Sequence, residues 1–507
     1  MTTSDEPMPG LSAAGAAPEL TEAGFAVEIA DAPLLHTGLN LADLAHVVAL
    51  HEAGVLPPDA ASSLASLLLD VHAQPIEDFP YDPDYGESYN CRERAFTERI
   101  GRTAGWLHAG RPRREAVRVA LRLRLRRDLM SLVGDAAGFV TALSGRAHEH
   151  AETVFADHTY LQQAQPSTFG HYLLASAQPV LRDAERLQSA LAWINASPCG
   201  AGCVNGSMLV PHRDRLAALL GFSSVIEHTR DAMWQTDGLL NMVSTAASLV
   251  VTLDKLAEDL EIYASQEFDF VDLAAPYTRS SVLMPQKRNP YALSMVRGQA
   301  GVVIGQLTGM FAVMKSPSAR SDNLIFAYGE VPRALTAVGR STRLMRGVID
   351  TLHVNTARMA QVLQQSFAQA TDVAEHVMMT CGLDYRSAYL VVGEAVRHAS
   401  ASGKVGVDID GAALDRAASV VLGEPLGLAG TDLRPATDPA RLVAARDVPG
   451  GAAPHLVRDM AARAARRADA LAAAAGTEME RFDAAESALI EAARRLAGGE
   501  VVSPAVE

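Results

Sequence analysis

The chain has 507 residues, of which 49% are hydrophobic and only 5% aromatic, so aliphatic side chains must form most of its core. Its net charge of -15 at pH 7 argues against a nucleic-acid partner. No uninterrupted run of about 18 apolar residues occurs, because even the segment 239–260 contains Asn241, Thr245 and Asp254. A soluble protein with no membrane partner is therefore predicted.

The four cysteines are scattered along the chain, at Cys91, Cys199, Cys203 and Cys381. No further Cys or His residue accompanies Cys199 and Cys203 at the spacing of a zinc site, so no metal is expected. Residues 1–18 have the composition of a disordered leader and not that of a signal peptide. Reduced thiols and a cytoplasmic location are therefore predicted.

The predicted elements are helices throughout, and the predicted fold class is all-α. Residues 19–115 mix short helical patterns with Gly and Pro, and are expected to form an N-terminal domain. Apolar residues then repeat at helical spacing over five long segments, which predict an elongated bundle over residues 116–365: they are 116–150, 170–196, 231–268, 291–314 and 329–355. Residues 366–507 predict a smaller helical domain with an extra tail, whose segment 458–496 is expected to form one or two exposed helices.

The long predicted helices have apolar faces that are too wide for a single partner helix. Segment 231–268, for example, presents Leu239, Val243, Ala247 and Val250. Self-association into a symmetric homo-oligomer is therefore expected. The one local exception to the acidic charge is the stretch 111–127, which contains eight arginines.

Four polar clusters interrupt the helical pattern, each at a predicted helix end: 86–93, 108–115, 157–166 and 278–290. In a bundle of antiparallel helices such ends gather at one level and can build a shared site. The last cluster brings a hydroxyl, an ammonium and an amide close together, between prolines that restrict the backbone. It is either an anion-holding loop or a solvated connection between helices.

The segment Ser281-Val-Leu-Met-Pro-Gln-Lys-Arg-Asn-Pro290 resembles the signature of the aspartase/fumarase superfamily. Further segments resemble argininosuccinate lyase in particular, in the same order along about residues 40–455. They are Thr159–His171, Ser265–Phe270, Asp384–Gly393 and Gly450–Pro454. The tail from about residue 475 onward lies outside the resemblance.

This resemblance implies an all-helical homotetramer with a central bundle shared by four chains, in which each active site draws residues from three of them. The implied reaction is a reversible anti-elimination from a small carboxylate substrate, an N-substituted aspartate or related succinyl compound. It releases fumarate and needs no metal or cofactor.

The chemistry implied for the site residues follows from the charge that develops during elimination. Removing a proton next to a carboxylate gives a carbanion delocalised into an aci-carboxylate, which Lys287 and Asn289 would stabilise. Ser281 is implied as the general base, acting as an alkoxide in a closed, dry site. Thr159 and Gln162 would hold carboxylate oxygens of the substrate, as would Arg113, which can pair with a carboxylate through two hydrogen bonds.

Several positions depart from the family pattern. Tyr160 and Tyr89 stand where histidines are usual, so proton delivery would differ. Arg114 replaces an asparagine expected to touch the substrate, and Asp43 replaces a serine. His158 is either a relay beside Thr159 or a packed histidine.

The register of the Ser281 loop is also open, because Ser280 and Val282 replace the expected glycine and second serine. If the loop slips by one residue, Ser280 becomes the base.

The segment 317–328 lacks the Tyr, Gln and Lys that hold the amino-acid end of the leaving group in argininosuccinate lyase, and has Arg320, Ile325 and Tyr328 near their places. A site without those partners binds that leaving group less tightly. Arg114 and Arg320 favour an anionic leaving group, unless neighbouring acids pair with them. Three hypotheses follow: a lyase with a different leaving group, an authentic argininosuccinate lyase, or an inactive structural homologue.

Overall fold

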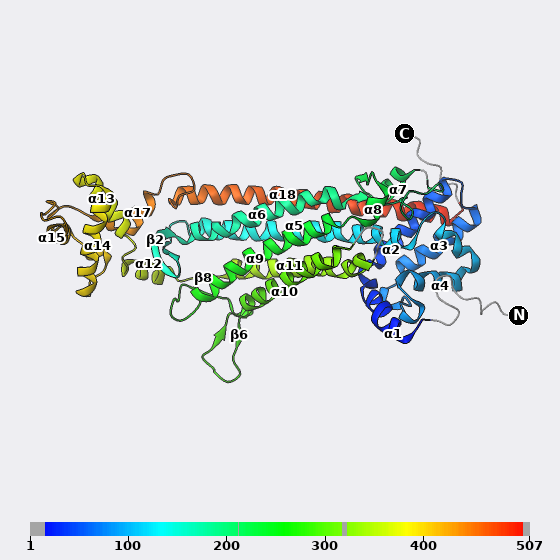
Figure 1. Cartoon of the computed structure of the whole chain (residues 1–507), viewed down its shortest axis with the longest axis horizontal. Coiled ribbons are helices and arrows are strands. Elements are labelled where there is room, and N and C mark those ends of the chain that lie inside the picture. Colours follow the sequence, from blue (N-terminus) through cyan, green and yellow to red (C-terminus); the bar gives the residue numbers. More distant parts are fainter. Residues whose placement is uncertain (1–15, 211, 317–321, 500–507) are drawn as a thin grey trace.

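The computed structural model describes residues 16–210, 212–316 and 322–499. Figure 1 shows an elongated molecule with a long helical bundle in the middle and a small helical domain at each end. The only strands in these ranges form four two-stranded sheets. The prediction of an all-α fold is therefore confirmed. The predicted leader falls almost entirely outside the described residues.

The N-terminal end is a compact group of short helices around one end of the long helix α2. Its core contains Leu44, Val48, Leu64 and Phe96, all almost fully buried. The elements are α1 (Pro18–Leu20), the π-helical turn η1 (Thr21–Phe25), α2 (Ala26–Glu52), α3 (Pro58–Ala73), the 3-10 turns η2 (Ile76–Asp78) and η3 (Pro83–Tyr85), α4 (Ser88–Ile100) and η4 (Gly101–His108).

The central bundle follows the five predicted segments with one break. Its helices are α5 (Arg113–Glu149), α6 (Phe169–Ile194), α9 (Asp237–Tyr263), α10 (Tyr291–Met314) and α11 (Asp322–Thr351). The predicted helix 231–268 is divided into α8 (Thr229–Trp234) and α9, because Gln235 adopts an extended conformation between them. Arg122 donates a hydrogen bond to the Gln235 side chain, which holds this break in place.

Among the described residues one helix, α9, is long and apolar enough to cross a membrane by composition alone. More than half of its most apolar stretch is buried inside the protein. Residues such as Val243, Val250 and Leu260 belong to the main core. Packing within the bundle therefore accounts for the composition of α9.

The arginine-rich stretch forms a buried ladder along α5. Arg118, Arg122 and Arg126 lie four residues apart on one face of the helix, and each is almost fully buried. Their guanidinium groups donate to main-chain oxygens near the ends of α8, α6 and α7 (Arg213–Leu219), which are those of Met233, Trp193 and Gly221 at 2.7, 2.7 and 3.2 Å. Positive charge at the C-terminal ends of helices is favourable. The ladder therefore ties three helices to α5.

The small domain opposite the N-terminal end has its own core, which includes Val377, Val391 and Leu414. Its helices and turn, with the helix α12 that leads into it, are α12 (Thr356–Gln364), α13 (Ala370–Cys381), α14 (Tyr385–Ala401), η6 (Gly406–Asp408), α15 (Gly411–Val421), α16 (Arg434–Thr437) and α17 (Pro439–Ala444).

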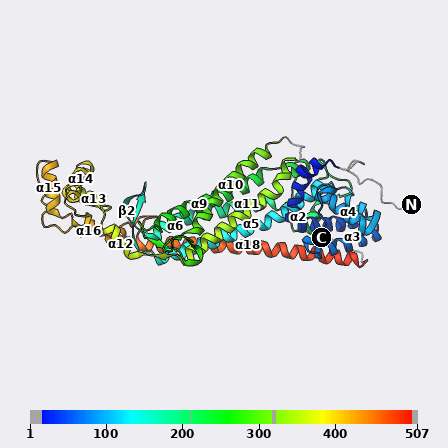
Figure 2. The same ribbon diagram turned by 90° about the horizontal axis from the view of Figure 1, so that it is seen from below.

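The tail forms one 44-residue helix, α18 (Pro454–Ala497), which returns along the whole bundle. Figures 1 and 2 both show it beside α5 and α6, reaching the N-terminal domain. Phe482, Leu489 and Leu496 on it are buried, so the expectation of exposed helices is wrong. The predicted domain 366–507 therefore contains two parts: a separate small domain, and a helix that belongs to the bundle.

Replacing Phe482 with Ala is expected to destabilise the protein by about 3–5 kcal/mol, because a buried ring packed against Arg126 is lost. The exposed Ser487→Ala on the same helix should change stability by no more than about 0.5 kcal/mol. Denaturant unfolding would compare the two variants. If Phe482→Ala changed stability as little as Ser487→Ala, the end of α18 would add nothing to stability.

The four small sheets shape the connections between the helices. An antiparallel hairpin joins β1 (Val154–Thr159) to β2 (Gln162–Thr168), where only a polar helix end was predicted. The remaining pairs are parallel β3 (Ala196–Ser197) with β4 (Ser224–Val225), antiparallel β5 (Val271–Asp272) with β8 (His353–Val354), and antiparallel β6 (Arg279–Ser280) with β7 (Arg288–Asn289).

Candidate functional site

The Ser281 loop is the end of an arm that projects from the bundle between α9 and α10 (Figure 1). The strands β6 and β7 form its stem, and Ser281 follows β6 directly. The Ser281 main-chain N–H donates to Lys287 O at 3.2 Å, and the Asn289 side-chain amide donates to Arg279 O at 2.9 Å. The three predicted catalytic residues of this loop are therefore held within one short hairpin.

Two backbone amides point at the Ser281 hydroxyl. Its Oγ accepts hydrogen bonds from Leu283 N–H at 3.3 Å and Met284 N–H at 3.0 Å. Hydrogen bonds to an oxygen that becomes negative stabilise the charged form. In this register the Ser281 hydroxyl lies in the turn of the loop, while Ser280 is the last residue of β6.

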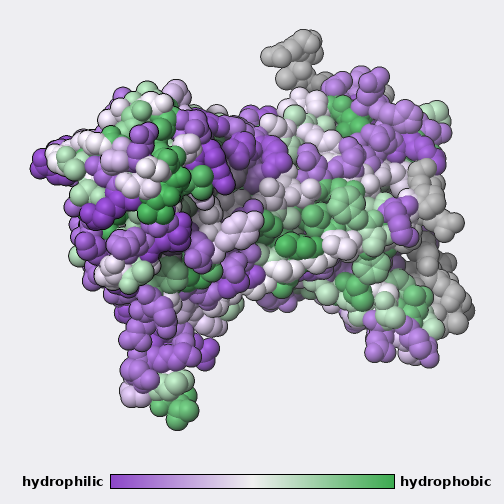
Figure 3. Space-filling view, turned by 60° about the vertical axis from the view of Figure 1, so that its left-hand side comes forward, coloured by the Kyte–Doolittle hydropathy of each residue, from purple (hydrophilic) through white to green (hydrophobic). Residues whose placement is uncertain are grey.

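The tip of the arm is apolar and unsupported within this chain. The side chains of Val282 and Leu283 are 108% and 83% exposed, and Figure 3 shows the arm ending in a hydrophobic tip. The described part of the chain therefore leaves this tip uncovered.

The Thr159 cluster lies on the turn of the β1–β2 hairpin. Thr159 pairs with Gln162, and the two residues between them, Tyr160 and Leu161, have positive φ angles of 54° and 58°. A two-residue turn of this kind normally uses Asn and Gly, because bulky side chains are strained there. Tyr160 is 98% exposed, so this turn places its phenol in solvent at the end of the hairpin.

His158 is packed among aromatic rings at the base of this turn. Its ring lies within 6.2 Å of the ring centroids of Phe155, Tyr263, Phe268 and Phe270. Burial lowers the pKa of His158, so the ring is neutral near pH 7. This arrangement favours the packed histidine over the relay.

Asp43 and Tyr89 lie in a fully buried network at the N-terminal end of the bundle. The Asp43 carboxylate accepts hydrogen bonds from Arg92 at 2.7 Å, Arg111 at 2.5 Å and the Tyr89 hydroxyl at 2.6 Å. Burial alone would raise the pKa of Asp43, but the two guanidinium groups outweigh it and hold the pKa below its usual range. Asp43 and Tyr89, which were both predicted to contact the substrate, therefore already have hydrogen-bond partners inside the protein.

Arg113 and Arg114 begin α5 beside this network. Arg113 donates to Glu87 at 3.0 Å and to the Asn90 side chain, while Arg114 lies 3.5 Å from Glu28. Their side chains remain 40% and 31% exposed, so they keep donors for a ligand.

Tyr328, from the segment that departs from the family pattern, lies close to these arginines. Its hydroxyl accepts a hydrogen bond from Arg118, one turn further along α5. Arg320 lies outside the described residues, so the structure describes no pairing for it.

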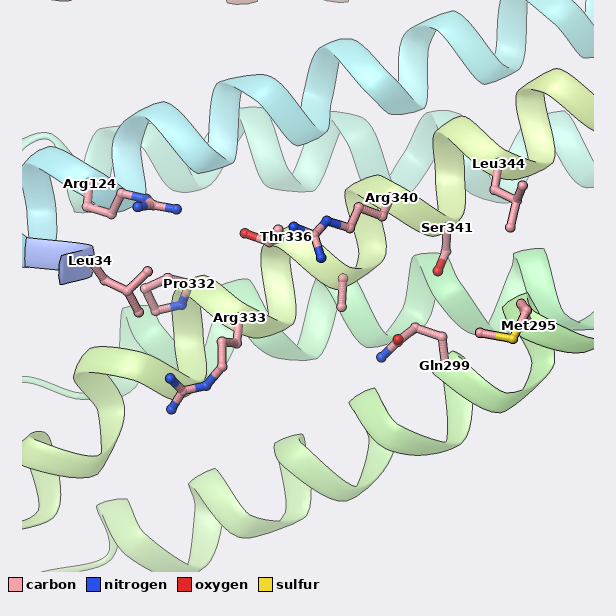
Figure 4. A pocket seen from close by; sticks show the side chains of 11 residues that line it. Leu34, Arg124, Met295, Gln299, Pro332, Arg333, Thr336, Arg340, Ser341 and Leu344 are labelled. Carbon is pink, nitrogen blue, oxygen red and sulfur yellow. The ribbon is translucent and has the colours of Figure 1, made fainter. Parts of the chain in front are cut away.

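Within one chain these groups do not meet. Arg113 opens α5 and the hairpin with Thr159 follows the other end, and 37 helical residues span about 55 Å. A cavity of about 460 Å³ lies between α10 and α11. Figure 4 shows Gln299, Arg333 and Arg340 among the side chains that line it. None of the predicted site residues that the structure describes lines this cavity.

Three residues of the site region were not singled out as site residues from the sequence: Arg92, Arg111 and Glu115. Arg92 and Arg111 meet at Asp43, and Glu115 holds a glycine loop. All three lie in the polar clusters 86–93 and 108–115, which were the available signal. Contacts between positions 49 or 68 residues apart leave no pattern in a single sequence.

Comparison with known proteins agrees with this architecture. Residues 39–305 match the family "Lyase" and residues 367–444 match "Argininosuccinate lyase C-terminal". The argininosuccinate lyase of Methanothermobacter thermautotrophicus is 31% identical over 82% of this chain and 89% of its own. That of Geobacillus thermodenitrificans is 34% identical over 70% of this chain and 78% of its own.

Among solved structures, an EDDS lyase in complex with formate has a TM-score of 0.85 and 26% identity, and 96% of each chain is covered. A class II fumarase from Schistosoma mansoni shares the fold alone, with a TM-score of 0.67 at 15% identity over 80% of this chain and 90% of its own. Together with the helical bundle, these matches confirm the predicted class, the aspartase/fumarase superfamily. The chain belongs to the lyase family that includes the argininosuccinate lyases.

Proposed function

We propose that this lyase catalyses the reversible anti-elimination of fumarate from an N-substituted aspartate or related succinyl compound. The observation that carries the proposal is the Ser281 hydroxyl, which accepts two backbone N–H groups in a loop that also presents Lys287 and Asn289. An EDDS lyase variant with bound fumarate is among the similar structures, with a TM-score of 0.85.

The proposed reaction assigns one role to each group. The Ser281 alkoxide takes the proton next to a carboxylate, and the electron pair moves into that carboxylate, where Lys287 and Asn289 stabilise the charge. The pair then forms the double bond of fumarate as the bond to the leaving heteroatom breaks. The leaving atom takes up a proton, for which the exposed Tyr160 hydroxyl is the proposed donor. Thr159 and Gln162 hold the substrate.

The leaving group is proposed to carry a carboxylate or another anionic group. Arg114 stands in place of a neutral asparagine, and its contact with Glu28 is long, at 3.5 Å. Arg113 and Arg114 together can bind more than one carboxylate. The names of the curated relatives support authentic argininosuccinate lyase activity as the second candidate.

Ultraviolet detection of fumarate tests the two candidates together. Purified protein would be mixed with argininosuccinate, aspartate, nitrosuccinate, EDDS and N-substituted aspartates, and with fumarate plus amines in the reverse direction. Robust turnover of argininosuccinate would rule out the proposal of a different leaving group. If no compound changed the ultraviolet absorbance while the oligomer was intact, the result would support an inactive homologue instead.

The distance between the Arg113, Thr159 and Ser281 segments supports a site shared between chains. The helix α10 has the surface that close association needs: Gly298, Gly301, Gly305 and Gly309 lie exposed on it, with open space where a side chain would extend. Met295, Val302 and Phe311 are exposed on the same helix. A homotetramer in which α10 packs against other copies would cover this face and bring the three segments together.

Replacing Gly305 with Leu is expected to stabilise the isolated chain and to destabilise the oligomer. Leu favours a helix over Gly by about 0.8 kcal/mol, so an isolated chain gains stability. A close helix contact has no room for the side chain, so the oligomer should dissociate and fumarate release should fall at least about 10-fold. The control is Gly476→Leu, an exposed position of α18 with equal open space. Light scattering would measure the mass, and an unchanged Gly305→Leu oligomer would contradict the α10 interface.

A further inference from the structure

The first turn of α5 is tied to a glycine loop by one buried carboxylate. Glu115 Oε1 accepts the Gly200 N–H and Oε2 accepts the Gly202 N–H, both at 2.7 Å. The Glu115 residue is 2% exposed, so these bonds are shielded from water. Each oxygen of the carboxylate therefore fixes one end of a three-residue turn.

The loop can adopt this shape only with glycine at both positions. Gly200 and Gly202 have φ angles of 70° and 60°. An added Cβ would lie 2.8 Å from Arg213 Cγ at Gly200 and 2.7 Å from Gly206 O at Gly202. The two amides are thus aimed at Glu115 by a backbone that other residues would strain.

The same loop covers the segment that leads into Arg113. A Cβ on Gly110 would lie 2.3 Å from Ser207 Oγ and 3.1 Å from Leu209 Cβ, so side chains of the loop lie close against the Gly110 backbone. Arg113 and Arg114 directly precede Glu115 in the first turn of α5. Moving the loop would therefore move the turn that carries both arginines.

We propose that Glu115 is a positioning residue for Arg113 and Arg114, which it holds in place by fastening the loop 200–210 to the first turn of α5. The proposal rests on the proposed function, since it takes these arginines to bind carboxylates of the substrate. It assigns to Glu115 an effect on substrate affinity and not on the chemical step.

The ionisation of Glu115 makes the attachment of the loop 200–210 to the first turn of α5 depend on pH. The charged and titratable groups that face it are Arg111, two residues before α5, Arg213 from α7 and the Cys199 thiol of the loop. Burial raises the pKa of Glu115 from 4.5 to about 7, although both amides and both arginines favour the carboxylate. Opening the loop would hydrate the group and lower its pKa again. Raising the pH from about 4.5 to about 7 therefore favours the open loop, and a further rise has no effect.

The test combines steady-state kinetics with hydrogen exchange on the intact protein. For Glu115→Gln we expect KM to rise roughly 10- to 100-fold while kcat changes less than about 3-fold, because uniform substrate binding is lost. The wild-type KM should rise as the pH increases from about 4.5 to about 7 and then level off, and this rise should be absent in Glu115→Gln. Glu115→Asp keeps the charge and should fall between the two.

Hydrogen exchange of the Gly200 and Gly202 amides separates this inference from the proposed function, because it needs no substrate. Relative to intrinsic exchange rates, wild-type protection should fall between about pH 4.5 and pH 7 and stay constant above that range, and protection in Glu115→Gln should be lower and independent of pH. The matched control is Glu98→Gln, which removes an exposed ion pair with Arg94 on α4. Equal loop protection in wild type and Glu115→Gln would overturn the proposal, as would a loss confined to kcat.

Discussion

Ser281→Ala is expected to lower kcat for fumarate release by about 10²- to 10⁴-fold, with the oligomer and its melting temperature unchanged. The side chain lies at a projecting loop and makes no buried contact, so its loss costs little stability. The substitution removes the oxygen that accepts hydrogen bonds from Leu283 N–H and Met284 N–H. The measurement is the ultraviolet absorbance of fumarate under saturating substrate.

Ser280→Ala is the matched control, because Ser280 is the neighbouring exposed serine of the β6 strand. It should retain most of the activity. If Ser280→Ala abolishes fumarate release and Ser281→Ala does not, the register of the loop is shifted by one residue and Ser280 is the base.

Mixed oligomers extend the same experiment to the proposed site shared between chains. Chains with Ser281→Ala are expected to be inactive alone, and chains with Arg113→Ala to release little fumarate at substrate concentrations near the wild-type KM. If each site takes these two residues from different copies, co-assembly of the two variants restores some sites with both native groups. No recovery of activity on mixing would contradict a site built from several chains.

Asp43→Asn is expected to destabilise the protein by about 3–5 kcal/mol. The side chains of Arg92 and Arg111 are 0% and 4% exposed and share the Asp43 carboxylate, so its loss leaves two buried charges without their counter-ion. Midpoints of thermal and denaturant unfolding would measure the change. Asp70→Asn, on the exposed side of α3, is the control and should shift stability by no more than about 0.5 kcal/mol.

The pH dependence of this effect has a definite sign. The pKa of Asp43 is below its usual range in the folded protein, so its contribution is complete above the unfolded pKa of about 3.9. It is lost as the pH falls through the lower folded value. The stability gap between wild type and Asp43→Asn should therefore be constant near pH 7 and close under strongly acidic conditions. A gap that persists there would assign the effect to packing and not to charge.

The long helices and the motif segments could be predicted because their signals are local. Apolar spacing located α5, α6, α10 and α11, and the Ser281 signature located the arm. The hairpin at Thr159 was missed because Tyr160 and Leu161 occupy a turn that normally requires Asn and Gly.

The unpredicted part of the site depends on distant contacts. No spacing rule indicates that Asp43 meets Arg92 and Arg111, or that Glu115 reaches Gly200. The tail was expected to be exposed because Ala and Arg dominate it, yet Phe482 and Leu489 supply enough apolar area for one buried stripe.

The return of α18 to the N-terminal domain has a consequence for biosynthesis. Leu489, Ala493 and Leu496 belong to the same core as Leu44 and Leu64, and Ser62 donates to Ala497 O at 2.8 Å. A ribosome that adds about 5–20 residues per second needs tens of seconds to pass from the first of these residues to the last. During that time the N-terminal domain has an incomplete core, so nascent chains are exposed to chaperones and proteases until α18 has been made.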